Sequence, residues 1–274
     1  MPLDNNPLAL HTWTLDSTPL AKVLQIARAV GWDAVELRRI DFDRAEAAGQ
    51  SEADVLRLVR DSGLAVSAVG VTFGWMLADG PAREQLLATI EKSCAAAAAL
   101  GCATVMSPVD RERGDLAQAA ASIRQVGDIA ARHGVRLALE FNSQASQFNT
   151  LESVREVLAL AGHSSVGLLL DTYHLQRSGR VGRSFAEVAP DEIFYVQYSD
   201  APRGGSQPGN TLDRLPPGDG SVDFQGIFGL LGEKGYAGPL SYEAPNPAAW
   251  EREPEVVARE ALQATRTVLV GVPA

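Results

Sequence analysis

The sequence has 274 residues, of which 46% are hydrophobic and 21% charged, an ordinary globular composition with ample material for a hydrophobic core. Its formal net charge of −10 is unfavourable for binding phosphate backbones, so we expect no nucleic-acid partner. No apolar run approaches the ~20 residues that span a bilayer, and residues 1–4 show no basic segment leading into an apolar one, so we expect a cytoplasmic protein without a membrane partner.

A recurring pattern organises the chain: a helical segment ends in a glycine, and a short apolar run follows. A glycine directly after a helix suits the left-handed C-cap position, where a Cβ would be strained. The apolar runs are mostly continuous, which is typical of parallel strands that are covered on both faces. The pattern occurs at residues 29–37, 61–70, 99–107, 132–140 and 233–243, with its glycines at Gly31, Gly63, Gly101, Gly134 and Gly235.

Eight strands separated by helices follow from this pattern. Amphipathic helices are expected at residues 51–63, 83–101 and 116–134. Strands that alternate with helices over this length predict a single (βα)8 TIM barrel, one domain over residues 1–274. A doubly wound open sheet is the alternative, and it is disfavoured because no GxGxxG follows the first strand. The expected strands are residues 7–13, 33–37, 65–71, 103–107, 135–142, 166–172, 193–199 and 239–244.

Polar residues stand at the carboxyl ends of these strands, which is where TIM barrels place their active sites. His133 and His163 lie elsewhere, next to a helix-ending glycine and in a polar turn, and are expected to be structural or solvated. In chain order the strand-end candidates are His11 and Trp13, Glu36 and Arg38, Ser107, Glu140 and Asn142, Asp171 and His174, Gln197 and Asp200, and Glu243 and Asn246.

A divalent-metal site is predicted from four of these candidates, which end four consecutive strands: Glu140, Asp171, Gln197 and Glu243. Three carboxylates that converge at one rim repel one another strongly unless a cation lies among them. Carboxylate and amide oxygens suit Mn²⁺ or Mg²⁺ first, and then Co²⁺ or Zn²⁺. The alternative is that each carboxylate caps the helix that follows it, but four such residues in register favour the metal.

At these residues the sequence resembles the xylose isomerase-like TIM barrel superfamily, often described as sugar phosphate isomerases and epimerases. The resemblance covers nearly the whole chain and rests on "ALEF" (138–141), "LLLDTYH" (168–174), "DRLPPGDGSVDF" (213–224) and "SYE" (241–243). It implies that the four candidates bind one divalent metal. It also implies that Glu140 and Glu243 act as acid and base on opposite faces of the substrate.

Two branches of the superfamily are most similar, and they differ in their reactions. Inosose isomerases match "ALEF", "GLLLDTYH" and the "PPGDG" segment, but carry His where this chain has Gln197. Dehydroshikimate dehydratases match "IFYVQYSDAPR" (193–203), Gln197 included, and "GPLSYEAPN" (238–246), whereas the loop 142–150 departs from their pattern. Hydroxypyruvate isomerase also has Gln at that position.

The predicted function is a divalent-metal-dependent isomerase or epimerase that acts on a keto sugar or cyclitol ketone by proton transfer through an enediolate. A metal-dependent dehydratase (a lyase) and a non-catalytic sugar-binding relative remain as alternatives. The usual prior for such enzymes is a homo-oligomer, most often a dimer. Glu140, Glu243 and His174 are the predicted catalytic residues, and the predicted substrate-binding residues are His11, Trp13, Glu36, Arg38, Trp75, Asn142 and Arg214, with Phe73 beside them.

Two other enzyme classes are disfavoured. A Schiff-base aldolase needs a lysine at a strand end, but Lys22, Lys92 and Lys234 all lie in helical segments. A metal-dependent DNA-repair nuclease needs a histidine-rich site and a basic face, whereas this chain has 4 histidines and a net charge of −10.

Overall fold

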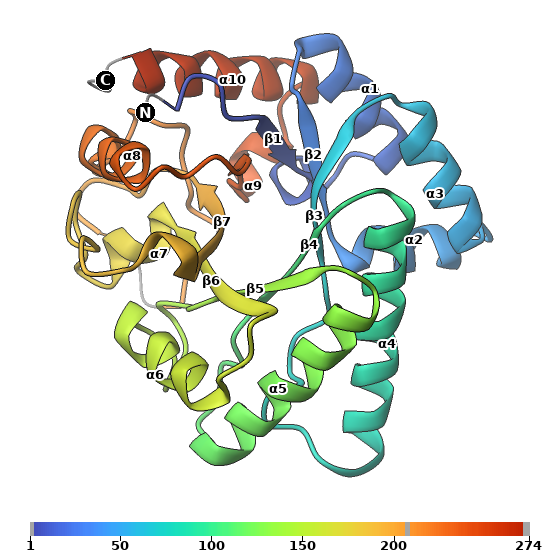
Figure 1. Ribbon diagram of the computed structural model, residues 1–274. Helices are drawn as coiled ribbons and strands as arrows, with labels where there is room; N and C mark the ends of the chain where they lie inside the picture. The colour runs from blue at the N-terminus through green and yellow to red at the C-terminus, as the bar shows by residue number, and fades with distance from the viewer. Residues whose placement is uncertain (1–2, 206–208, 271–274) are drawn as a thin grey trace.

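The computed structural model describes residues 3–205 and 209–270. Eight parallel strands close into a barrel, and each strand pairs with its neighbours in the sequence (Figure 1). The pairing of β1 with β8, which aligns Leu8 with Leu240, closes the ring. This confirms the predicted (βα)8 fold. The strands are β1 (Leu8–His11), β2 (Ala34–Leu37), β3 (Ala65–Gly70), β4 (Thr104–Pro108), β5 (Arg136–Glu140), β6 (Val166–Asp171), β7 (Ile193–Tyr198) and β8 (Leu240–Tyr242).

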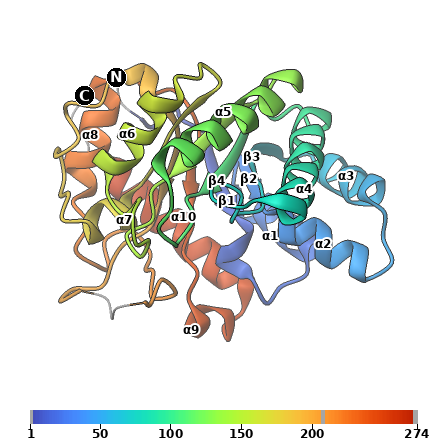
Figure 2. The same ribbon diagram turned by 90° about the horizontal axis from the view of Figure 1, so that it is seen from below.

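The helices surround the barrel in Figure 1, and Figure 2 shows α9 and the loop after β7 on the same side of it. Short 3₁₀ helices at Thr12–Leu15 and Pro190–Glu192 add to them, so the first strand ends earlier than expected. The α-helices are α1 (Leu20–Val30), α2 (Arg39–Ala47), α3 (Glu52–Asp61), α4 (Gly80–Ala99), α5 (Leu116–Arg132), α6 (Leu151–Ala161), α7 (Thr172–Arg177), α8 (Phe224–Glu233), α9 (Pro247–Trp250) and α10 (Pro254–Val270).

The glycines that follow the helices have the expected conformation. Gly31 after α1 and Gly134 after α5 have φ angles of 96° and 68°, in the left-handed region that a side chain disfavours. At Gly31 the backbone N–H donates to the carbonyl of Ala27, which completes the end of the helix. These caps let each helix turn directly into the next strand.

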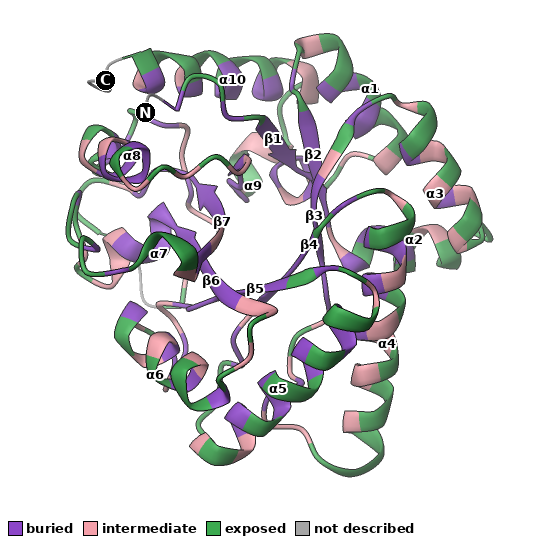
Figure 3. Cartoon of the chain, viewed as in Figure 1, coloured by how far each residue is buried: buried purple, intermediate pink, exposed green. Residues whose placement is uncertain are grey.

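Burial follows the pattern expected of a parallel barrel (Figure 3). The strands are almost entirely buried, while each long helix is buried on one side and exposed on the other. A small apolar cluster that includes Ala138, Leu169 and Tyr195 is separate from the large core of the protein. Cys94 and Cys102 are both buried and unpaired, and burial raises the pKa of the Cys94 thiol to about 12. Within the described ranges, no helix combines the length and the apolar composition that crossing a bilayer requires.

Candidate active site

A cavity of about 380 Å³ lies at the carboxyl ends of the strands. The three predicted catalytic residues, Glu140, His174 and Glu243, line it. Of the predicted substrate-binding residues, five also line it, together with Phe73, and these are His11, Trp13, Arg38, Asn142 and Arg214.

Trp75 and Glu36 do not reach the cavity wall, which corrects the prediction that they contact substrate. Trp75 is fully buried, and its indole N–H donates to Ser107 Oγ at 2.9 Å, so the ring packs within the protein. Glu36 is 0% exposed and interacts with Gln197 and Tyr195 instead. Burial, followed by the charge of Glu243, raises the pKa of Glu36 to about 8. A nearby divalent cation would favour its ionised form.

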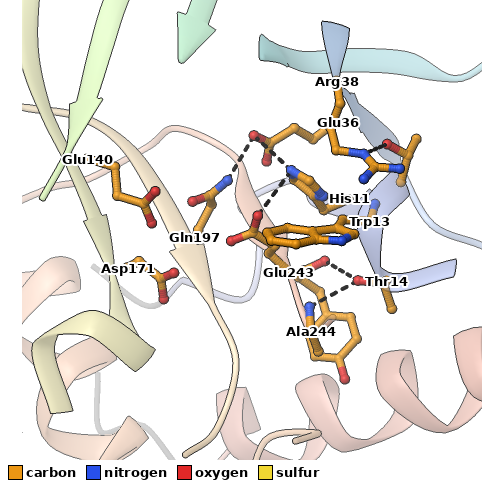
Figure 4. Close-up of polar contacts among 12 residues, drawn as sticks. His11, Trp13, Thr14, Glu36, Arg38, Glu140, Asp171, Gln197, Glu243 and Ala244 are labelled. Carbon is orange, nitrogen blue, oxygen red and sulfur yellow. Dashed lines mark hydrogen bonds and ion pairs between the residues drawn. The ribbon is translucent and has the colours of Figure 1, made fainter. Parts of the chain in front are cut away.

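The four predicted metal ligands lie together at one end of the barrel interior. Asp171 and Gln197 are aligned on the adjacent strands β6 and β7. Glu140 ends β5, and Glu243 follows β8, with its backbone N–H bonded to the carbonyl of Tyr198. Figure 4 shows that the four side chains, drawn from these neighbouring strands, point toward a common space. All four are at most 5% exposed.

His174 lies against the same group. Glu140, Asp171 and His174 each offer one ligand atom within 4.8 Å of the others. The ring nitrogen Nδ1 lies 2.9 Å from Ser143 Oγ and 3.2 Å from the Ser143 backbone nitrogen, while Nε2 lies 3.6 Å from Glu140 Oε1. Burial lowers the pKa of His174 to about 3, so the ring is neutral near pH 7. The neutral ring can therefore hydrogen-bond to a substrate oxygen without adding a charge to the site.

The buried carboxylates differ in their tendency to ionise. Burial raises the pKa of Glu243 to about 6, against the attraction of the Arg214 guanidinium. Burial, and then the charges of Glu243 and Asp171, raise the pKa of Glu140 well above its usual range. Burial alone would raise the pKa of Asp171 too, but Arg214 and His174 outweigh it, and that pKa is lowered. Carboxylates with pKa values near neutrality are suited to proton transfer.

Arg214 is the cation that the structure places among these acids. Its Nη1 donates to Asp171 Oδ2 at 2.6 Å and to Glu243 Oε2 at 2.8 Å. Its Nη2 lies 3.2 Å from His174 Nε2, and the guanidinium carbon stands 4.5 Å from the centre of the Tyr173 ring. The side chain is only 3% exposed. Arg214 therefore contacts the acids directly and lines the cavity.

The loop that carries Arg214 is held by Asp200, a strand-end residue that the site prediction did not use. The buried Asp200 carboxylate accepts hydrogen bonds from the backbone N–H groups of Gly218, Gly220 and Val222 at 2.8–2.9 Å. The backbones of Asp200 and Leu215 also pair as an antiparallel bridge. These contacts anchor the segment that directly follows Arg214.

His11 bridges two acids at the bottom of the site (Figure 4). Its Nδ1 accepts a hydrogen bond from the Trp13 backbone N–H at 3.0 Å, so the neutral ring carries its proton on Nε2. That nitrogen lies 3.6 Å from Glu36 Oε1 and 3.4 Å from Glu243 Oε1. Burial, followed by the charges of nearby arginines, holds the pKa of His11 well below its usual range. His11 is thus a neutral donor that faces both carboxylates.

Two buried oxygens in this group have no hydrogen-bond partner among the described residues: Glu140 Oε1 and Gln197 Oε1. Buried acceptors without partners are costly, and a bound cation is one way to satisfy them. The charges agree with this. Glu140, Asp171 and Glu243 would carry three negative charges when ionised, Arg214 offsets one, and a divalent cation would offset the other two. The residues present therefore fit a divalent metal.

Several cavity residues escaped the sequence prediction because they lie on loops or early in a helix. Arg39 and Ile40 begin α2, Arg111 follows β4, and Thr211 lies in the loop after β7. The only signal for Arg111 was its place shortly after a strand end. Thr211 reaches the cavity because of the path of a long loop, and a loop path cannot be predicted from the sequence pattern. His133 and His163 contact Glu91 and Asp128 and are not part of the cavity lining.

Comparisons with known proteins give relatives with more than one activity. A family model described as a xylose isomerase-like TIM barrel matches residues 24–268. A 3-dehydroshikimate dehydratase of Pseudomonas aeruginosa is 28% identical over 252 residues, which cover 87% of this chain but 38% of that longer protein. An inosose isomerase of Bacillus velezensis is 24% identical over 263 residues, 93% of this chain and 94% of the relative. A crystal structure of the IolI protein with a zinc atom has a TM-score of 0.87 at 21% identity, covering 98% of this chain and 99% of that one.

Proposed function

The chain belongs to the xylose isomerase-like TIM barrel family, and from this membership and the chemistry of the cavity we propose that it is a divalent-metal-dependent isomerase or epimerase of a keto sugar or cyclitol ketone. The observation that carries the proposal is the pair of buried glutamates, Glu140 and Glu243, which face one cavity and have raised pKa values. Proton removal beside a carbonyl and its return elsewhere need two such groups.

The metal would be held by Glu140, Asp171, Gln197 and Glu243, with Gln197 binding through its unpartnered oxygen. When bound, a divalent cation polarises a carbonyl and its neighbouring hydroxyl, which acidifies the C–H bond between them. Mn²⁺ and Mg²⁺ are the first candidates for these oxygen ligands.

The protein's own residues would divide the remaining work. One of the two glutamates takes the proton from carbon, and the other returns a proton to the second position. His174 and Arg214, which lie 3.2 Å apart at Nε2 and Nη2, would hold or protonate the substrate oxygens. Trp13 and the exposed ring of Phe73 would supply the apolar side of the cavity, which orients the sugar and excludes water.

The first test is the metal content of the purified protein, compared with a Glu140→Ala/Glu243→Ala double variant. We expect bound divalent metal in the wild type and its loss in the variant. Solvent-deuterium incorporation is then measured for inososes and ketoses, and wild-type protein should introduce deuterium next to the carbonyl. A wild type that binds no metal after incubation with Mn²⁺ would contradict the proposal.

A second candidate, dehydration of an acidic keto compound, is favoured by Arg111. This exposed arginine lines the cavity, and its side chain has no ion pair or hydrogen bond within residues 3–205 and 209–270. By contrast, Arg38 is bound to Asp16 and Arg39 to Asp43. An unpaired guanidinium in a cavity wall suits a carboxylate substrate. The removed proton would then be followed by loss of a β-hydroxyl as water.

Arg111→Gln separates the two reactions. For a dehydratase, the variant should raise the KM for dehydroshikimate with little change in kcat, and mass spectrometry should detect loss of one water molecule by the wild type. Arg113→Gln is the matched control, because Arg113 is exposed on the same loop but does not line the cavity. Deuterium exchange into a neutral ketose that is insensitive to Arg111→Gln, without water loss from the acid, would support the isomerase instead.

A further inference from the structure

We propose that Glu36 is a positioning residue that fixes the side-chain amide of Gln197, so that its oxygen and not its nitrogen faces the metal site. The inference rests on the proposed metal site. It assigns Glu36 a role different from the substrate contact expected at the carboxyl end of β2.

The contact between the two side chains is direct and buried. Gln197 Nε2 donates to Glu36 Oε1 at 2.9 Å, and both residues are 0% exposed. Figure 4 shows the amide nitrogen of Gln197 on the side of Glu36 and its oxygen on the side of Glu140. That oxygen has no hydrogen-bond partner among the described residues. The amide nitrogen is therefore hydrogen-bonded, whereas the amide oxygen is free to bind a cation.

The orientation of the amide is a choice between two carboxylate environments. An amide has two donors on nitrogen and one acceptor oxygen, and a half-turn about its last bond exchanges them. On the Glu140 and Asp171 side, neighbouring carboxylates attract the NH₂ group, and this orientation would point N–H bonds at the cation position. On the other side, Glu36 offers an acceptor to the same NH₂ group. The hydrogen bond to Glu36 thus stabilises the amide orientation in which the oxygen of Gln197 faces the metal site.

Glu36 is itself held in place from two directions. The Tyr195 hydroxyl lies 3.1 Å from Glu36 Oε2 and 2.7 Å from Ser67 Oγ. On the cavity side, His11 Nε2 lies 3.6 Å from Glu36 Oε1. Glu36 therefore contacts one residue of the adjacent strand β1 and one of β7, and Ser67 of β3 holds the Tyr195 hydroxyl in turn. Outer residues that orient a metal ligand typically change metal affinity when they are altered.

The test is Mn²⁺ binding by calorimetry to the full chain after removal of metal with a chelator. Glu36→Leu removes the acceptor, and we expect Mn²⁺ to bind about 10–100-fold more weakly than to the wild type. Glu36→Gln keeps a side-chain oxygen that can accept from Gln197, so it should restore the affinity to within about threefold. Gln197→Ala should weaken binding, and adding Glu36→Leu to it should change nothing further. Such non-additivity is the mark of two residues that act as one unit.

Each outcome decides the question. Wild-type affinity in Glu36→Leu, or an equal further loss when Glu36→Leu is added to Gln197→Ala, overturns the role of Glu36 while the metal site stands. A wild type that binds no Mn²⁺ removes the proposed metal site and this inference together. If circular dichroism shows that Glu36→Leu does not fold, Glu36→Asp replaces it, because the shorter side chain withdraws the acceptor but keeps the carboxylate. A merely structural role predicts that Glu36→Gln fails to rescue binding in any folded variant.

Discussion

Arg214 Nη1 lies 2.6 Å from Asp171 Oδ2, and both side chains are buried at the bottom of the cavity. A second bond from the same nitrogen reaches Glu243. One guanidinium therefore neutralises part of a group of acids whose remaining charge suits a divalent cation. Arg214 and the proposed metal would together keep these carboxylates ionised, and the two contributions can be separated by experiment.

Arg214→Gln should destabilise the protein most when metal is removed. Breaking a buried ion pair by removing one partner costs about 3–5 kcal/mol, because an uncompensated charge is left behind. We expect the melting temperature to fall sharply in the presence of a chelator and to recover in part when Mn²⁺ is added. Arg39→Gln is the control, since Arg39 is nearly as buried but pairs with Asp43 at the surface. Equal losses of stability with and without Mn²⁺ would contradict the shared role.

Asp200→Asn should loosen the loop that carries Arg214. In the wild type, backbone N–H groups donate to a carboxylate oxygen of Asp200, and the replacement places an amide NH₂ group, itself a donor, against them. Each buried donor left without a partner costs about 1–3 kcal/mol, so the free energy of unfolding in urea should fall by at least that amount. Asp219→Asn, an exposed change in the same loop, should stay within about 0.5 kcal/mol of the wild type. An Asp200→Asn protein of wild-type stability would show that the loop has other anchors.

The sequence was sufficient to predict the barrel and the convergence of three acids and one amide at its carboxyl end, because both depend on chain periodicity. Glycine caps and continuous apolar runs recur at each strand, and residues at the ends of adjacent parallel strands must lie close together, as Asp171 and Gln197 do. Neither inference requires knowledge of where a particular side chain points.

The depth of a side chain could not be predicted in this way. Glu36 stands at a strand end like Glu140, yet it lies below the cavity floor, where it bonds to Tyr195 and Gln197. Trp75 follows a strand but turns inward to Ser107. A position at the end of a strand specifies only which edge of the sheet a residue occupies. The depth of its side chain in the barrel and the direction in which it points also depend on register shifts, such as the one between Val35 and Glu36, and on the paths of the loops.

His174→Asn distinguishes a proton-transfer group from a metal ligand. We expect turnover to fall by about 10²–10⁴-fold, the usual contribution of a general acid or base. Mn²⁺ affinity should be nearly unchanged, whereas Asp171→Asn should weaken it strongly. Ser143→Ala is a useful control, because it removes the hydroxyl that faces Nδ1 and leaves the ring in place. A large loss of Mn²⁺ affinity in His174→Asn would place the imidazole among the ligands, as its closeness to Glu140 and Asp171 permits.

Glu36→Gln should change how the stability of the metal-free protein depends on pH. Burial, and then the charge of Glu243, raise the pKa of Glu36 from 4.5 to about 8 in the folded chain. Between these values the folded state holds a proton that the unfolded state has lost, so wild-type stability declines as pH rises, by at most about 1.4 kcal/mol per pH unit from this group. Above about 8 the decline from Glu36 ends, because both states are ionised. Glu36→Gln lacks this contribution. In urea titrations with a chelator present, the free energy of unfolding of the variant should therefore increase relative to that of the wild type between pH 5 and pH 8. A constant difference over that range would mean that Glu36 is ionised in the folded protein throughout.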